Sequence, residues 1–181
     1  NRLADEPIPA LLDGRLDIAL VCKLDGQMNR VRLHRLFDDE LIALVAASHP
    51  WARQPRVEAG DFDGVHLVLH QSYDPASTPA VPLPIPPGAT PGRLTTIPLA
   101  NDLLVEMVAS GDAVTILPSW VAAPYLSGRD VVAVPVGSTP QSRTWYCATR
   151  HGAREEPVDA FVDVLLGHFG GERRQPRAVV S

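Results

Sequence analysis

The 181-residue sequence has few of the patterns that build covalent, metal-centred or membrane-spanning structures. It holds two cysteines, Cys22 and Cys147, and neither lies in a C-x-x-C motif or in a cluster with metal-ligand spacing. Both fall in apolar segments typical of strands, so we expect buried, reduced thiols rather than a disulfide or a nucleophile. No apolar run approaches the roughly 20 residues that a membrane-spanning helix needs. We therefore expect no metal ion and no membrane association.

The motifs of common nucleotide-binding and hydrolytic sites are absent as well. The sequence contains no G-x-S-x-G, P-loop or G-x-G-x-x-G motif, so nothing in it indicates an enzyme or a bound cofactor. Lys23 is the single lysine, and 16 basic against 21 acidic residues give a formal net charge of −5. Because a surface that binds phosphate must be basic, we do not expect this chain to bind nucleic acid directly.

The apolar residues of the sequence are spaced as in α/β proteins. It is 45% hydrophobic, with a mean hydropathy of +0.02, so one large domain or two small lobes can bury a core. Apolar runs and alternation predict strands at residues 16–21, 31–37, 41–46, 65–69, 94–97, 113–117, 131–136 and 143–149. Helical periodicity and end signals predict helices at residues 7–12, 99–110, 119–126 and 157–169. Because strands and helices alternate through the second half, we expect parallel sheet built from βαβ units.

Two segments leave their structure open. The pair Asp38-Asp39 separates residues 31–37 from 41–46, and either a hairpin-like connection or a bend within one sheet fits. Residues 75–92 hold seven of the 18 prolines, which cannot donate a sheet hydrogen bond and disfavour helix in the residue before them. We expect an irregular surface loop at 75–92; a ligand for a proline-recognition domain is the alternative.

Four motifs follow one another in a recognisable order. An L-x-x-G-x-[LV]-D-[IL]-[AG]-[IL] motif spans residues 11–20, and a small-small-x-His-Pro-[LW]-[AG] motif spans residues 46–52. A [DE]-[FL]-x-x-x-x-[LF]-[IV] pattern follows at 61–68, and V-x-[AS]-G-x-[AG]-[IV]-x-[IL]-[LV]-P at 108–118. In this order, the four resemble the effector-binding domain of LysR-type transcriptional regulators.

A finer resemblance concerns one subgroup of these regulators. Residues 101–104, 107–109 and 117–121 are similar to the methionine-biosynthesis regulators that sense homocysteine. The resemblance implies a small-molecule effector, with homocysteine or a related amino acid as the first choice, and no other cofactor.

The resemblance also implies a fold and its division. The family fold is α/β, with two Rossmann-like lobes arranged like a type 2 periplasmic binding protein. We place lobe I at residues 1–64 and 138–181, and lobe II at residues 65–137 with the proline-rich insertion inside it. The match begins late, so the first strand and helix of lobe I and the DNA-binding winged helix-turn-helix look absent. Operator DNA would then be bound only through that absent domain.

The function implied is ligand sensing in a bacterial transcription regulator. Such a domain is cytoplasmic and forms a homodimer or homotetramer, and the effector shifts the balance between its conformations. A solute-binding protein of a transport system, which shares a related fold, is the alternative. An α/β enzyme is a third class, disfavoured by the missing motifs.

In the family fold, the ligand cleft lies at the C-terminal ends of strands. Pro118 ends one such strand, and Ser119 is placed to cap the helix that follows. The residues that follow the strand exits are therefore our ligand-binding candidates: Cys22, Lys23, His70, Gln71, Ser72, Pro98, Leu99, Ala100, Asn101, Asp102, Pro118, Ser119 and Trp120.

Each candidate also has a simpler structural role open to it. Lys23 suits a ligand carboxylate or is a solvated side chain, and residues 70–72 suit a ligand or a plain surface loop. Asn101 suits a helix N-cap, and Asp102 suits either an amino group or the helix dipole. Trp120 suits a pocket wall or the core. An α-amino acid would place its carboxylate on Lys23 or on helix N–H groups, its ammonium on Asp102 and its side chain against Trp120.

Overall fold

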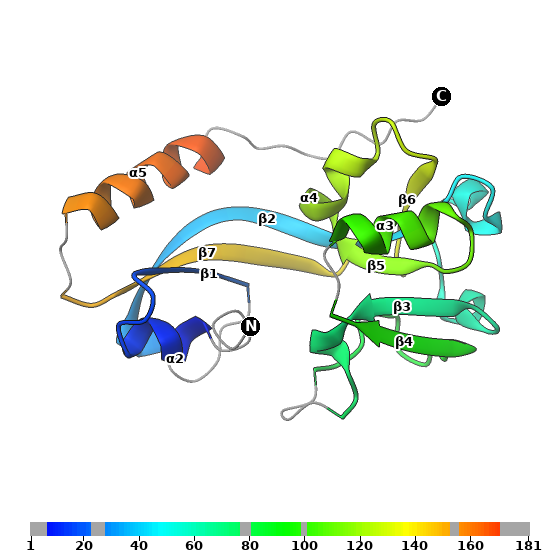
Figure 1. Cartoon of the computed structure of the whole chain (residues 1–181), viewed down its shortest axis with the longest axis horizontal. Coiled ribbons are helices and arrows are strands. Elements are labelled where there is room, and N and C mark those ends of the chain that lie inside the picture. Colours follow the sequence, from blue (N-terminus) through cyan, green and yellow to red (C-terminus); the bar gives the residue numbers. More distant parts are fainter. Residues whose placement is uncertain (1–6, 23–27, 77–80, 99–100, 153–155, 171–181) are drawn as a thin grey trace. The chain divides into compact units, whose positions relative to one another are not determined.

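The structure is a computed structural model that describes residues 7–22, 28–76, 81–98, 101–152 and 156–170 (Figure 1). Two compact units divide the chain: one holds Asn1–Asp38 and Arg143–Ser181, and the other holds Asp39–Ser142. The chain passes between them twice, after Asp38 and after Ser142. Within the described ranges, no helix has both the length and the apolar content needed to cross a membrane.

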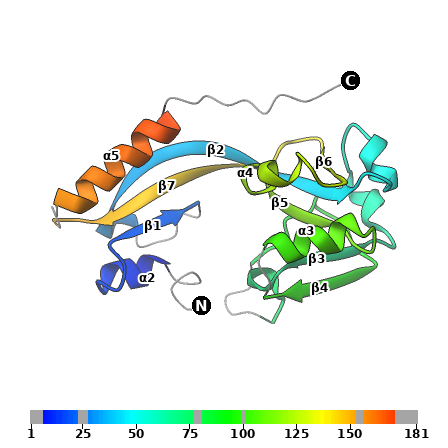
Figure 2. The same ribbon diagram turned by 45° about the horizontal axis from the view of Figure 1, so that its top comes forward.

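The first unit packs a helix on each face of a small sheet. Its strands run in the order β1 (Ile18–Val21), β7 (Ser142–Arg150) and then β2 (Val31–Ala46), with β1 antiparallel to β7. Successive residues of a strand face opposite sides. Helix α2 (Pro7–Leu12) packs on one face and helix α5 (Glu156–Gly170) on the other (Figure 2). Val162, Leu165, Leu166 and Phe169 of α5 pack on the sheet with i, i+3, i+4, i+7 spacing. Phe161 belongs to the apolar spacing that predicted the helix, but it is 52% exposed.

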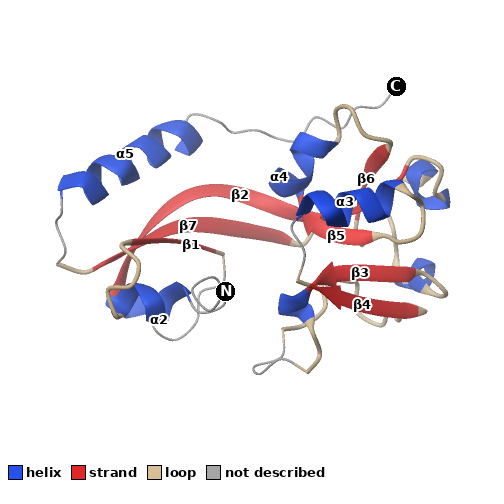
Figure 3. Ribbon diagram, viewed as in Figure 1, coloured by secondary structure: helices blue, strands red, loops and turns tan. Residues whose placement is uncertain are grey.

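The second unit is built on a mixed sheet. The second half of β2 pairs antiparallel with both β5 (Thr115–Pro118) and β6 (Val131–Pro135). Strands β3 (His66–His70) and β4 (Arg93–Ile97) form a parallel pair, seen as two arrows pointing the same way in Figure 3. A parallel bridge between Leu67 and Val114 joins this pair to the start of β5.

Different structures cover the two faces of this sheet. Helices α3 (Asn101–Ala109) and α4 (Ser119–Ala122) pack on one apolar layer. The other layer is closed by Trp51 and Phe62 from the short 3-10 helices η2 (Pro50–Arg53) and η3 (Ala59–Phe62). The proline-rich segment adds three partly buried residues to that layer: Leu83, Ile85 and Ala89.

The proline-rich segment is the crossover connection between β3 and β4. Its described residues, 75–76 and 81–92, form neither helix nor strand, which confirms the predicted irregular backbone. It is not a plain surface loop, however, because Leu83 and Ile85 pack against the core of the second unit. A helix normally makes such a crossover; the described residues of this one cover the sheet without a helix, through Leu83, Ile85 and Ala89.

Three expectations need correction or adjustment. Asp38-Asp39 is not a turn: β2 is one 16-residue strand from Val31 to Ala46, so the bend within one sheet is the reading that stands. The sheet of the second unit is parallel at β3–β4 but antiparallel at β2, because β2 enters from the first unit and runs against β5 and β6. Cys147 is buried as expected, whereas Cys22, at the end of β1, is only partly buried; both are free thiols.

The compact units also differ in extent from the expected lobes. The boundaries lie at 38/39 and 142/143, rather than at 64/65 and 137/138. The reason is that the second half of β2, with η2 and η3 after it, packs in the second unit. The remaining predicted elements appear with their ends shifted by a few residues, including the predicted helix 119–126, which is split into α4 and the 3-10 helix η5 (Ala123–Tyr125).

Candidate functional site

Several strands of the second unit end at one edge of its sheet. His70 pairs with Ile97 at the ends of the parallel strands β3 and β4. Strand β5 runs parallel to β3 through the Leu67–Val114 bridge, so its end at Pro118 lies on the same side. The structure therefore brings together these predicted residues, which follow the three strand ends: Gln71, Ser72, Pro98, Ser119 and Trp120.

Other candidates are placed less directly. Helix α3 begins at Asn101, three residues after Pro98, so Asn101 and Asp102 belong to the same edge. Lys23, Leu99 and Ala100 lie outside the described residues. Cys22 belongs to the first unit, after β1. The structure thus assembles the described candidates of the second unit, whereas Cys22 belongs to the other unit.

The turn after β3 is held by its own side chains. The ring nitrogen Nδ1 of His70 accepts a hydrogen bond from the backbone N–H of Ser72 over 3.2 Å and lies 3.1 Å from the Ser72 hydroxyl. His70 is thereby the N-cap of the 3-10 helix η4 (Gln71–Tyr73). His70, Gln71 and Ser72 are exposed, so the turn is both a structured loop and an accessible polar surface.

Asp102 has a partner within the protein. The Tyr125 hydroxyl, from η5, is hydrogen-bonded to the Asp102 carboxylate. Loss of solvation at Tyr125, together with this bond and the negative charge of Asp102, raises the pKa of Tyr125 above its ordinary value. The Arg129 guanidinium lies 5.5 Å from the centre of the Tyr125 ring and forms an ion pair with Glu106. Asp102 therefore helps to hold α3 against the segment that follows α4.

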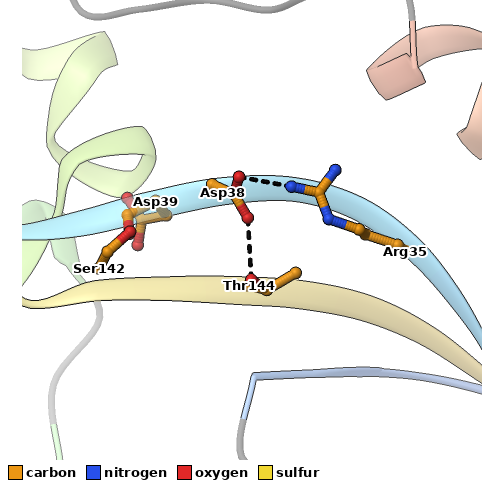
Figure 4. Close-up of polar contacts among 5 residues, drawn as sticks. All are labelled: Arg35, Asp38, Asp39, Ser142 and Thr144. Atoms are coloured by element: carbon orange, nitrogen blue, oxygen red, sulfur yellow. Dashed lines mark hydrogen bonds and ion pairs between the residues drawn. The ribbon is translucent and has the colours of Figure 1, made fainter.

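Asp39 is the residue of this edge that the sequence reasoning missed. Its side chain is 5% exposed, and its carboxylate oxygen Oδ1 accepts hydrogen bonds from the Ser119 hydroxyl over 2.6 Å and from the Trp120 N–H over 3.4 Å. The Ser142 hydroxyl donates to the Asp39 carbonyl oxygen over 3.4 Å, and the two residues lie side by side in Figure 4. Ser119 was expected to cap a helix, but it is the first residue of α4 and its hydroxyl is committed to Asp39.

Trp120 lies at the surface and not in the core. It is 46% exposed, which makes it one of the largest accessible apolar side chains of the second unit. Its backbone is fixed by the bond to Asp39, while much of its indole stays open to solvent. Of the two readings left open by the sequence, the core position is wrong.

A separate hollow of about 260 Å³ lies at the opposite end of β3 and β5. Its lining includes His49, His66 and Asp112. The His66 ring is held between the Asp112 carbonyl oxygen, 3.2 Å from Nδ1, and the Thr95 hydroxyl, 2.9 Å from Nε2. His66 and His70 stand four residues apart, but on an extended strand this spacing puts them at opposite ends of β3. The described part of the chain has no group of three or more His, Cys, Asp or Glu arranged to hold a metal ion.

Comparisons with known proteins agree with this architecture. The family model of the LysR substrate binding domain matches residues 2–170. The HTH-type transcriptional regulator MetR of Escherichia coli (strain K12) is 28% identical over 167 residues, which are 90% of this chain and 50% of that protein. The DNA-binding transcriptional dual regulator OxyR of the same organism is 27% identical over 142 residues, covering 74% of this chain and 45% of that protein. The chain thus spans about half the length of these relatives.

A solved structure supports the same fold. The regulatory domain of MetR, a LysR family regulator from N. meningitidis, superposes with a TM-score of 0.69 and 25% identity, covering 91% of this chain and 75% of that one. The fold predicted from the sequence, α/β and like that of the type 2 periplasmic binding proteins, is confirmed.

Proposed function

Because the chain belongs to the LysR substrate binding domain family, we propose that it is the effector-sensing part of a LysR-type transcription regulator. The curated relatives reported above are transcription regulators and not transport proteins, which disfavours the solute-binding alternative. The observation that carries the proposal is the gathering of strand ends at one edge of the second unit, where Ser72 and Trp120 are accessible. In open α/β sheets, the C-terminal ends of strands are where ligands bind.

The effector we propose is a small amino acid, with homocysteine as the first candidate. Exposed polar groups at Ser72 and Asn101 suit the charged end of an amino acid, and the accessible indole of Trp120 suits a short apolar or thiol side chain. Asp102 is available to an ammonium group in addition to Tyr125, since a carboxylate has about four acceptor positions. Cys22, Lys23, Leu99 and Ala100 stay in the proposal as sequence-based candidates.

Further properties of the whole protein belong to the same proposal. It acts in the cytoplasm as a homodimer or homotetramer, and it reaches operator DNA through a separate DNA-binding domain. The net charge of −5 supports that division of labour, because the effector domain itself has no excess of basic residues with which to hold phosphates.

Thermal unfolding with added amino acids tests the proposed effector. A ligand that binds the native state raises the unfolding midpoint, with about 2.7 kcal/mol of added stability at a concentration 100 times Kd. We expect a saturable rise with homocysteine that is lost in Trp120→Ala and retained in Leu126→Ala. Leu126 is a matched control, because it is also a large exposed apolar residue of the second unit, at 41% exposure. An equal shift in both variants would refute the site at Trp120, and no shift in the wild type would refute this effector.

A further inference from the structure

Three segments of the second unit meet at one buried residue. Asp39 is the first residue of the unit along β2, and Ser142 is its last residue at the start of β7. Asp39 holds Ser119 and Trp120 through its carboxylate, and it holds Ser142 through its carbonyl oxygen. The corner between β5 and α4 is thus tied to both points at which the chain leaves the unit.

The hydrogen bonds of the Asp39 carboxylate are strong because they are buried and involve a charged group. Asp39 is 5% exposed, and the 2.6 Å contact from the Ser119 hydroxyl is a charge-assisted hydrogen bond shielded from water. A buried carboxylate must keep its hydrogen bonds, because leaving it unpaired costs far more than leaving an exposed one unpaired. The backbone supports the same junction, since the Leu41 N–H donates to the Gln141 carbonyl oxygen over 3.3 Å.

The neighbouring carboxylate is differently placed. Asp38 is 52% exposed, and its partners, Arg35 and Thr144, lie in the first unit (Figure 4). The Thr144 hydroxyl donates to the Asp38 carboxylate over 2.8 Å. Two adjacent aspartates therefore serve different units, and only Asp39 reaches the candidate effector edge.

We infer that Asp39 is a positioning residue that couples the Ser119–Trp120 corner to the strands entering and leaving the second unit. The inference rests on the proposed function, because the corner is part of the proposed effector site. A ligand that contacts Trp120 changes the backbone at Trp120, and Asp39 passes that change to Ser142 and to the Leu41–Gln141 pairing. Such coupling must act in both directions, because linkage between two sites is reciprocal.

Amide hydrogen exchange in the ligand-free protein tests the coupling directly. Ser119→Ala removes the strongest bond at the corner and should speed exchange of the Leu41 amide about fivefold or more. Ser142→Ala should in turn speed exchange of the Trp120 amide. The Val68 amide, which donates to the Val114 carbonyl oxygen over 2.9 Å elsewhere in the same unit, is the internal reference and should stay unchanged.

Substitutions at Asp39 separate positioning from general support of the fold. Asp39→Asn keeps an oxygen that accepts from Ser119 and Trp120, so exchange at Leu41 should remain near the wild-type rate. Asp39→Ala removes that oxygen and should speed exchange at Leu41 and Trp120 together. Asp38→Ala is the matched control and should leave both amides unchanged.

The outcomes are distinct from those of the effector test. If Ser119→Ala leaves Leu41 unchanged, or if Val68 speeds up as much as Leu41, the coupling is overturned whether or not any amino acid binds. If the coupling holds, homocysteine should slow exchange at Leu41 in the wild type and not in Asp39→Ala. A wild type that binds no amino acid would refute the proposed effector and leave the ligand-free result standing.

Discussion

Gly92 lies directly against the backbone of Gly64. A Cβ atom on Gly92 would stand 2.6 Å from the Cα of Gly64, well inside the distance at which two carbon atoms repel. The contact places the end of the proline-rich crossover beside the turn that precedes β3. Gly92 is therefore required for its lack of a side chain, independently of its backbone angles.

Gly92→Ala should lower the free energy of unfolding by about 1–3 kcal/mol, the usual cost of overpacking a close contact. Urea unfolding, followed by circular dichroism, measures the change. Gly60→Ala is the control, because a Cβ on Gly60 would meet nothing within 4 Å. Equal stability of the two variants would show that the crossover moves aside without cost.

Arg150 closes the end of α2 in the first unit. Its Nη1 donates to the carbonyl oxygens of Leu11 over 3.1 Å and Leu16 over 2.7 Å, and its Nη2 bonds Asp17 over 3.0 Å. Arg150→Ala should lower the free energy of unfolding by about 1.5–3 kcal/mol, because its charge-assisted bonds to two backbone carbonyls and to Asp17 are lost.

Arg15→Ala provides the comparison for Arg150. Arg15 pairs with Asp13 across an exposed surface, and such pairs contribute about 0–1 kcal/mol. Urea midpoints of the two variants should therefore differ clearly. A loss in Arg150→Ala no larger than that in Arg15→Ala would mean that water replaces the guanidinium at these carbonyl oxygens without cost.

Two threonines should respond in opposite directions to the same substitution. Thr115 is fully buried, and its hydroxyl has no hydrogen-bond partner in the part of the chain that the structure describes. Thr115→Val should raise the free energy of unfolding by about 1 kcal/mol, because an unpaired buried hydroxyl is replaced by a methyl group. Thr144→Val should lower it by about 0.5–1.5 kcal/mol, because the bond to Asp38 is lost. Thermal unfolding of both variants tests the signs; a loss on Thr115→Val would contradict the prediction.

His49 should contribute to stability at neutral pH and not at acidic pH. Its Nδ1 accepts the Trp51 N–H over 3.2 Å at the start of η2, and burial lowers its pKa below the ordinary value of 6.5. The unfolded chain therefore takes up a proton near pH 6.5 while the folded state does not. Stability linked to His49 is thus present above pH 6.5 and is lost as pH falls through the lowered pKa.

His49→Asn separates this titration from the cap. Asparagine keeps a side-chain oxygen that accepts the Trp51 N–H, but it does not titrate. Urea midpoints between pH 7 and pH 5 should fall less steeply in this variant than in the wild type. His168→Asn, on the exposed surface of α5, should leave the wild-type slope in place. A wild-type slope in His49→Asn would contradict the assignment.

Local sequence patterns predicted the elements well where the pattern and the packing agree. The apolar spacing of α5 and the proline in its first turn gave its position to within one residue at each end. The pattern was misleading at Asp38-Asp39, where two adjacent charges interrupt an apolar strand. Their partners, Thr144 and Ser119, lie 106 and 80 residues away in the sequence, so no local rule could show that the strand continues.

The sequence predicted the candidate residues that follow strand ends, but it did not predict Asp39. Reading the residues after each strand exit placed Ser72 and Trp120 at one edge of the second unit. Asp39 was not among the candidates because it lies just before the part of β2 that pairs with β5, and only residues after strand ends were considered. Strand β2 runs antiparallel to β5, with Leu41 opposite Pro118, so its beginning meets the end of β5. The direction of β2 was the missing information.

The proline-rich crossover has a consequence for the unfolded chain. Residues 81–92 contain five prolines, each of which restricts its own φ angle before any folding occurs. Closing this segment over the sheet therefore costs less conformational entropy than ordering a loop of ordinary composition. Part of the free energy that holds this segment on the sheet therefore comes from the restricted conformations of its prolines in the unfolded chain. An exposed residue such as Pro82 can matter to folding without touching the core.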